Sequence, residues 1–138
     1  MHQQLFPDLL QRSILVIDDS EDMLYLGRLI LEQEGFEVFT ASNGLRALEI
    51  LSQIKTPQLV LLDVHMADMD GYQFLKRFEI ENPDVFNQVS VVFYSAESLL
   101  VPSKAKGFIR KAGDMNLFLK SVRGYMDGCT HDTTQFLN

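Results

Sequence analysis

The sequence predicts an α/β fold built on a doubly wound sheet of five parallel strands. Short apolar runs rich in β-branched residues alternate five times with longer segments of helical period, which is the pattern of βα units. These runs are apolar throughout, as strands are when helices cover both faces of their sheet. A length of 138 residues, 46% of them apolar and 22% charged, allows one domain with a continuous core.

The first βα unit is expected at the start of this pattern. Its strand covers Ser13–Ile17, and its helix ends at Gly35, because glycine favours the backbone conformation that stops a helix. The second strand follows over residues 36–40. The apolar residues of the intervening helix that keep the i, i+3, i+7 spacing, and are therefore expected to be buried, are Met23, Leu26 and Ile30.

Two further units follow in the middle of the chain. The second helix starts at Asn43-Gly44, and Pro57 marks the exit from it. The third strand is Leu59–Leu62. A turn-rich stretch that ends at Gly71 leads into the third helix, which stops before Pro83. The residues expected to be buried by these two helices are Ala47, Leu51, Ile54, Leu75 and Phe78.

The last two strands are separated by an unusually short connection. They are expected over residues 89–94 and 108–110, and 12 residues separate Ser95 from Phe108. Pro102 and Gly107 shorten any helix in that segment, so we expect a fourth helix of one or two turns, or none. The final helix should bury its apolar stripe of Phe118, Val122, Tyr125 and Met126.

Composition excludes several classes of partner. A net charge of -7 argues against nucleic-acid binding, because such binding needs clustered lysine and arginine. The apolar runs are too short to cross a membrane, and the N-terminus lacks the charge and apolar core of a secretory signal. The single cysteine, Cys129, cannot form an internal disulfide. We therefore expect a cytoplasmic protein with neither nucleic-acid nor membrane partners.

Polar residues suited to catalysis or ligand binding directly follow four of the predicted strands. They are Asp18 and Asp19 after the first strand, Asp63 after the third, Ser95 after the fourth and Lys111 after the fifth. Ligands of open parallel sheets bind beyond these strand ends. Three neighbouring carboxylates repel one another unless they share a cation, and oxygen ligands suit Mg²⁺. A carboxylate can also be the nucleophile toward a phosphoryl group, with a lysine and a hydroxyl stabilising its charge.

The motifs at these positions resemble the receiver domain of two-component response regulators. They read ILVIDDS at 14–20, LLDVHM at 61–66 with MDG at 69–71, SA at 95–96 and FIRK at 108–111. The resemblance covers residues 13–126 and implies the flavodoxin-like receiver fold, with strand order 2-1-3-4-5. It also implies a division into an N-terminal extension (1–12), a receiver domain (13–127) and a polar C-terminal tail (128–138).

The resemblance also implies a phosphorylation site and a metal site. Asp63 would be the phospho-acceptor. The Mg²⁺ ligands would be Asp18, Asp19, Asp63 and the backbone carbonyl of His65.

The remaining roles implied by the resemblance concern switching and the lifetime of the phosphate. Ser95 would bind a phosphoryl oxygen, Lys111 would pair with the phosphoryl group, and Phe108 would be the aromatic residue that changes rotamer. His65 and Glu97, each two residues beyond a motif residue, would tune dephosphorylation.

The chain departs from the family pattern next to two of these motifs. Ala112 follows Lys111 where the family has a proline after a cis bond; a cis bond before alanine costs about 2.5 to 4 kcal/mol, so we expect a trans peptide or a rearranged loop. In the family the fourth helix lies on the face used for output and dimerisation, so a short fourth helix would also weaken dimerisation through that face. The apolar residues 99–101 could then form a contact surface.

The leading interpretation is a stand-alone receiver, which catalyses only its own phosphorylation and dephosphorylation and is not otherwise an enzyme. It would take phosphate from a histidine kinase or a histidine phosphotransfer protein and act on a downstream protein target. The alternative is a pseudo-receiver, an interaction module that works without phosphate.

Other interpretations explain only some of these residues. A dehalogenase-type phosphatase would need a second aspartate where His65 stands, and a flavin phosphate would be repelled by the acidic residues 18–22. Asp18 or Asp19 could cap the first helix, although a cap explains only one of them. Phe108 could simply fill the core.

Overall fold

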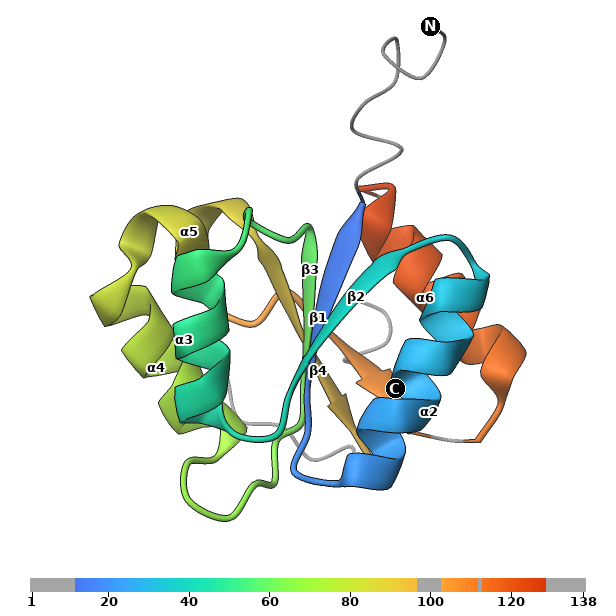
Figure 1. Cartoon of the computed structure of the whole chain (residues 1–138), viewed down its shortest axis with the longest axis horizontal. Helices are drawn as coiled ribbons and strands as arrows, with labels where there is room; N and C mark the ends of the chain where they lie inside the picture. The colour runs from blue at the N-terminus through green and yellow to red at the C-terminus, as the bar shows by residue number, and fades with distance from the viewer. Residues whose placement is uncertain (1–11, 97–102, 112, 129–138) are drawn as a thin grey trace, which may run out of the picture.

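The computed structural model describes residues 12–96, 103–111 and 113–128, and these build one five-stranded parallel sheet between two layers of helices (Figure 1). The strand order is β2-β1-β3-β4-β5, as the resemblance to receiver domains implies. Every neighbouring pair of strands is parallel. The strands are β1 (Ser13–Ile17), β2 (Glu37–Ala41), β3 (Leu59–Leu62), β4 (Ser90–Ser95) and β5 (Gly107–Arg110).

The helices divide between the two faces of the sheet. Figure 1 shows α2 (Glu21–Gln33) and α6 (Met115–Met126) side by side on one face. The other face carries α3 (Gly44–Gln53), α4 (Gly71–Glu81) and the short α5 (Pro83–Gln88). An ion pair between Arg123 of α6 and Glu34 just beyond α2 joins the helices of the first layer.

The four longer helices begin at side chains that accept backbone N–H groups, which the first turn of a helix leaves without partners. Ser20, Asn43, Asp70 and Asp114 are these caps. The cap of α4 is reciprocal, because the Gln73 side chain in turn accepts the backbone N–H of Asp70 at 3.0 Å. Short polar residues therefore set where each of these helices starts.

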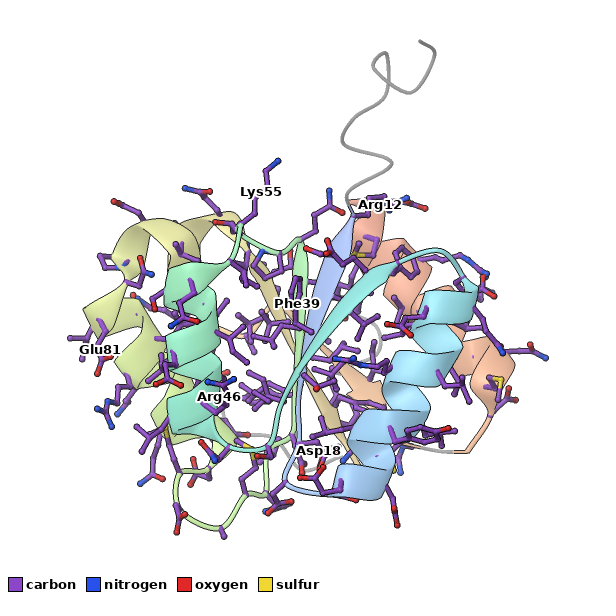
Figure 2. The ribbon with its side chains drawn as sticks, in the orientation of Figure 1. Arg12, Asp18, Phe39, Arg46, Lys55 and Glu81 are labelled. Atoms are coloured by element: carbon purple, nitrogen blue, oxygen red, sulfur yellow. The ribbon has the colours of Figure 1, made fainter. Side chains whose placement is uncertain are left out.

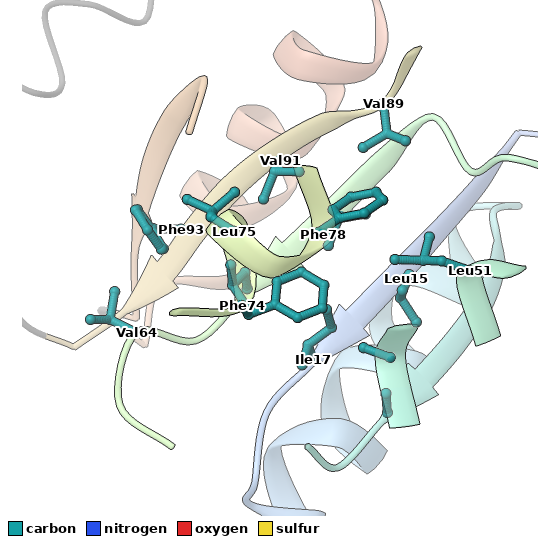
Figure 3. Packing of buried hydrophobic residues seen from close by; sticks show 14 of the residues in the cluster. Leu15, Ile17, Leu51, Val64, Phe74, Leu75, Phe78, Val89, Val91 and Phe93 are labelled. Carbon is teal, nitrogen blue, oxygen red and sulfur yellow. The ribbon is translucent and has the colours of Figure 1, made fainter. Parts of the chain in front are cut away.

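The core lies on both faces of the sheet. On the face of α3 and α4, Phe74 and Phe78 pack against the strands, with ring centroids 5.6 Å apart (Figure 3). On the other face, Leu31 of α2 and Val122 of α6 are fully buried against β1 and β4. Strand residues are therefore buried on both faces of the sheet, which explains why the strand sequences do not alternate between apolar and polar residues.

The structure corrects the predicted buried stripe of the first helix. Leu26 is 45% exposed, and Met23 and Ile30 are only half-buried. The buried residues are Leu24 and Leu31, which are seven positions apart and also share one face. Because α2 carries apolar residues around much of its surface, spacing alone does not identify the face that packs.

Elsewhere the predicted stripes hold at their centres and weaken at helix ends. Ala47, Leu51, Leu75, Phe78, Phe118 and Val122 are buried, whereas Ile54, Tyr125 and Met126, in the last turn or beyond, are half-buried.

Helix α5 is a second departure from the prediction. Pro83 does not only stop the preceding helix but also begins α5 at its first turn, where the missing N–H and fixed φ of proline fit. Phe86 of α5 packs edge-on against Phe78 of α4, with ring centroids 5.2 Å apart. This aromatic contact stabilises a helix of only six residues.

The connection between β4 and β5 contains no helix in its described parts, residue 96 and residues 103–106. Lys104 joins it to α4 through an ion pair with Glu79 at 2.5 Å. The predicted contact surface at 99–101, and Pro102, lie outside the described residues.

Candidate functional site

The carboxyl ends of the central strands bring the predicted site residues together. Asp18 and Asp63 directly follow the paired strand-end residues Ile17 and Leu62, so the two aspartates are neighbours. Figure 2 shows Asp18 beside the start of α2, at the opposite end of the sheet from Arg12. The aspartates therefore occupy the edge at which open parallel sheets bind ligands.

Three carboxylates form an acidic cluster at this edge. Asp18 is 1% exposed and Asp63 is 7% exposed, whereas Asp19 faces solvent. One carboxylate oxygen from each of the three lies within 4.8 Å of the others. Buried, close carboxylates of this kind fit a shared hard cation such as Mg²⁺, because carboxylate oxygen is its preferred protein ligand.

The structure also shows that neither Asp18 nor Asp19 caps α2. The cap is Ser20, whose hydroxyl accepts the N–H of Met23 at 3.3 Å. Asp18 instead accepts the N–H of Ser20 through Oδ1 at 2.9 Å, which leaves its Oδ2 directed to other partners. The interpretation of Asp18 or Asp19 as a helix cap is therefore wrong.

Lys111 carries the positive charge of the site. Its Nζ lies 2.6 Å from Oδ2 of Asp18 and 3.6 Å from Oδ2 of Asp63. The side chain is 15% exposed, so the pair is largely removed from water. The backbone N–H of Lys111 donates to the carbonyl of Ser95 at 2.9 Å, which extends the β4–β5 pairing up to the lysine.

The charge state of Asp63 depends on this environment. Burial raises the pKa of Asp63 above its ordinary value of 3.8, and the negative charge of Asp18 raises it further. The ammonium of Lys111 lowers the same pKa, as does the N–H of His65, which donates to Asp63 Oδ1 at 3.3 Å. The net effect is a carboxyl group that holds its proton more tightly than in water.

Gly71 allows α4 to start directly against the loop that carries Asp63. Its N–H donates to the carbonyl of Val64 at 2.8 Å. A Cβ at this position would lie 2.8 Å from the carbonyl oxygen of Asp63 and 2.9 Å from Cε1 of Phe93. Only glycine fits this approach without moving the acceptor loop.

Other predicted residues are placed by the structure while their roles stay predictions. Ser95 is buried at the end of β4, at 1% exposure, and Phe108 is buried in the core between sheet and helices. The backbone N–H of Phe108 donates to the hydroxyl of Tyr125 at 3.2 Å. His65 is exposed. Glu97 and the Lys111–Ala112 peptide bond lie outside the described residues.

One residue of the site was missed in the sequence. Lys111 Nζ lies over the ring of Tyr94, 5.1 Å from its centroid. Burial, with a smaller effect from the negative charge of Asp18, raises the pKa of Tyr94 to about 12, so the phenol stays neutral. The sequence signal for Tyr94 as a site residue is its position directly before Ser95 at the end of a strand.

Among the described helices, none combines the length and the apolar character needed to span a membrane.

Comparison with known proteins identifies the family. Residues 14–123 match the model of the response regulator receiver domain. The chain is 29% identical over 121 residues to sporulation initiation phosphotransferase F of Bacillus subtilis, covering 86% of this chain and 96% of that protein. It is 34% identical over 95 residues to the transcriptional regulatory protein ZraR of Klebsiella oxytoca, covering 69% of this chain and 21% of that protein.

Solved structures show the same fold. The chemotaxis protein CheY4 of Vibrio cholerae superposes with a TM-score of 0.73 at 22% identity, covering 82% of this chain and 97% of that one. The response regulator TrrA of Thermotoga maritima, solved in complex with Mg²⁺ and BeF, gives 0.71 at 24% identity and covers 83% and 99%. From the family match, the shared fold and the strand-end cluster together, the chain belongs to the response regulator receiver domain family of two-component signalling.

Proposed function

We propose that this chain is a phosphorylation-dependent switch that accepts a phosphoryl group from a phosphohistidine onto Asp63, in a Mg²⁺-dependent reaction. The observation that supports this proposal best is the position of Lys111, whose ammonium lies within 3.6 Å of Asp63 and 2.6 Å of Asp18 in a largely buried site. A buried lysine beside an acceptor carboxylate supplies positive charge where phosphoryl oxygens would gather.

The donor set fits a resident Mg²⁺ ion. Asp18, Asp19 and Asp63 would hold it, together with the backbone carbonyl of His65. When bound, the ion would neutralise part of the charge on the phosphoryl oxygens and reduce the repulsion among the three carboxylates.

The side chains of the protein account for the transfer itself. An ionised oxygen of Asp63 attacks the phosphorus, and the bond between phosphorus and the imidazole nitrogen of the donor breaks. The electron pair of that bond returns to the imidazole, whose other ring nitrogen carries a proton, so the products are an aspartyl phosphate and a neutral histidine. Lys111 stabilises the developing charge from one side of the acceptor, and the backbone N–H of His65 already donates to the same carboxylate.

The aspartyl phosphate would then act as a signal. It carries about -1.5 to -2 of charge in place of the single charge of the carboxylate, and it brings new acceptor oxygens to one buried point. Lys111 and the hydroxyl of Ser95 would be drawn toward that charge, and Phe108, on the strand next to Ser95, would follow by changing rotamer. We propose that the phosphate comes from a histidine kinase or a histidine phosphotransfer protein and that the phosphorylated face binds a downstream protein target.

The chain would therefore catalyse only its own phosphorylation and dephosphorylation. The Bacillus relative is a sporulation initiation phosphotransferase by name, which supports a role in relaying phosphate. In the alternative, the chain is a pseudo-receiver that keeps the fold and binds its partner without phosphate.

Intact-mass measurement with acetyl phosphate tests the proposal. With Mg²⁺ we expect one added phosphoryl group, which is absent in EDTA and in Asp63→Asn. Asp68→Asn, at an exposed position of the same loop, is the matched control and should be labelled as the wild type is. No adduct under conditions that label another receiver would favour the pseudo-receiver.

A further inference from the structure

We propose that Tyr94 is a positioning residue, whose ring holds the ammonium of Lys111 in place beside Asp63. The consequence for phosphorylation rests on the proposed function, whereas the contact itself can be tested without it.

The ring of Tyr94 packs against the hydrophobic core. Tyr94 is half-buried and packs against the core cluster on the side of α2 and α6, and its ring centroid lies 5.2 Å from that of Phe118. Phe118 is itself buried on α6. Core packing as a whole therefore supports the ring, and Lys111 Nζ lies over it at 5.1 Å from the centroid.

Lysine needs such a support more than most side chains do. Its ammonium stands at the end of a flexible four-carbon stem, and a face-on aromatic ring attracts it electrostatically. The two carboxylates that Lys111 also contacts, Asp18 and Asp63, both belong to the acidic cluster that would bind a cation. A neutral ring is not a ligand for that cation, so its contact with Lys111 is kept when the carboxylates are engaged elsewhere.

The contact is tested first by NMR of the unphosphorylated protein without metal. Protons above an aromatic face are shifted upfield, so the ε-methylene protons of Lys111, assigned by their loss in Lys111→Arg, should resonate upfield of those of the exposed Lys120. Tyr94→Phe should keep this shift, and Tyr94→Leu should abolish it. A wild-type Lys111 signal that coincides with that of Lys120 would overturn the proposal whatever the variants do.

The rate of phosphorylation by acetyl phosphate with Mg²⁺ is the second measurement. We expect Tyr94→Leu to slow adduct formation by about fivefold to twentyfold, and Tyr94→Phe to remain within about twofold of the wild type. Phe118→Leu is the control for lost packing, because Phe118 contacts the Tyr94 ring and belongs to the core cluster against which that ring packs. It should keep both the upfield shift and a rate within about twofold of the wild type.

The outcomes separate this inference from the proposed function. If the wild type takes no phosphoryl group but shows the upfield shift, the proposed function fails and the positioning contact stands. If Tyr94→Leu and Phe118→Leu slow the reaction equally, the effect is one of packing, and the positioning role is overturned.

Discussion

The ammonium of Lys111 and Oδ2 of Asp18 lie 2.6 Å apart, although the two residues are 93 positions apart in the chain. This pair is closer than the 3.6 Å that separates the same ammonium from Asp63. Lys111 therefore neutralises a candidate metal ligand more directly than it neutralises the proposed acceptor. A cation that binds the cluster has to compete with the lysine for Asp18.

Removing the lysine should destabilise the protein without metal. Lys111→Ala leaves the buried Asp18 and Asp63 without their positive partner, and we expect the free energy of unfolding in EDTA to fall by about 3 kcal/mol. Urea unfolding followed by far-ultraviolet circular dichroism measures this change. Lys104→Ala, which breaks only the exposed pair with Glu79, should change the same quantity by at most about 0.5 kcal/mol.

The same variant should bind Mg²⁺ more tightly. Without the competing ammonium, we expect the dissociation constant of Lys111→Ala for Mg²⁺ to fall about tenfold, from the loss of one nearby positive charge. The chain has no tryptophan, so isothermal titration calorimetry is the suitable measurement. Weaker binding than the wild type would show that the lysine shapes the cluster instead of competing with the ion.

Asp19 offers a test of the metal site that leaves folding alone. Because Asp19 is exposed, Asp19→Asn should leave the free energy of unfolding in EDTA unchanged while weakening Mg²⁺ binding by at least about tenfold. Asp22→Asn, an equally charged change at an exposed position in the first turn of α2, is the control. Equal losses of affinity in the two variants would mean that general charge, and not coordination, attracts the ion.

The raised pKa of Asp63 predicts a pH-dependent stability difference. Because folding raises this pKa, the ionised carboxyl opposes folding above the folded-state pKa, and its penalty disappears as the pH falls through that value toward 3.8. Asp63→Asn should therefore have a higher Tm than the wild type at neutral pH in EDTA, and the difference should shrink near about pH 4. Melting curves at both pH values test this, and the exposed Asp68→Asn should show no such trend.

Two glycines of the last βα unit should respond in opposite directions to the same substitution. A Cβ on Gly107 would lie 1.8 Å from the hydroxyl of Tyr125, which accepts the N–H of Phe108. Gly107→Ala should cost about 2 kcal/mol, because the tyrosine must move and its hydrogen bond is lost. Gly124→Ala on α6 meets no atom within 4 Å and should stabilise by about 0.5 to 1 kcal/mol. Urea midpoints of the two variants provide the comparison.

The sheet and the acidic cluster were predictable because each rests on a local signal. A run such as Leu59–Leu62 is apolar on both faces, and a polar residue such as Asp63 directly after it can only lie at the carboxyl end of the strand. Parallel pairing then brings Asp18 and Asp63 together without knowledge of the side chains between them.

What the sequence did not reveal depends on tertiary contacts. The buried face of α2 is chosen by the sheet, since Leu26 and Leu31 are equally apolar and only one of them packs. Helix α5 depends on the contact of Phe86 with Phe78, and the position of Tyr94 under Lys111 depends on the side-chain conformations of both residues. None of these relationships leaves a periodic trace in the sequence.

The position of the phosphoryl group after reaction with acetyl phosphate and Mg²⁺ identifies the acceptor residue. Borohydride reduces an aspartyl phosphate to homoserine, which peptide mass spectrometry can place in the chain. We expect homoserine at position 63 alone, formed only when Mg²⁺ is present. Homoserine at position 18 or 19, or its absence from a protein that carries the phosphoryl mass, would contradict the assignment of Asp63 as the acceptor.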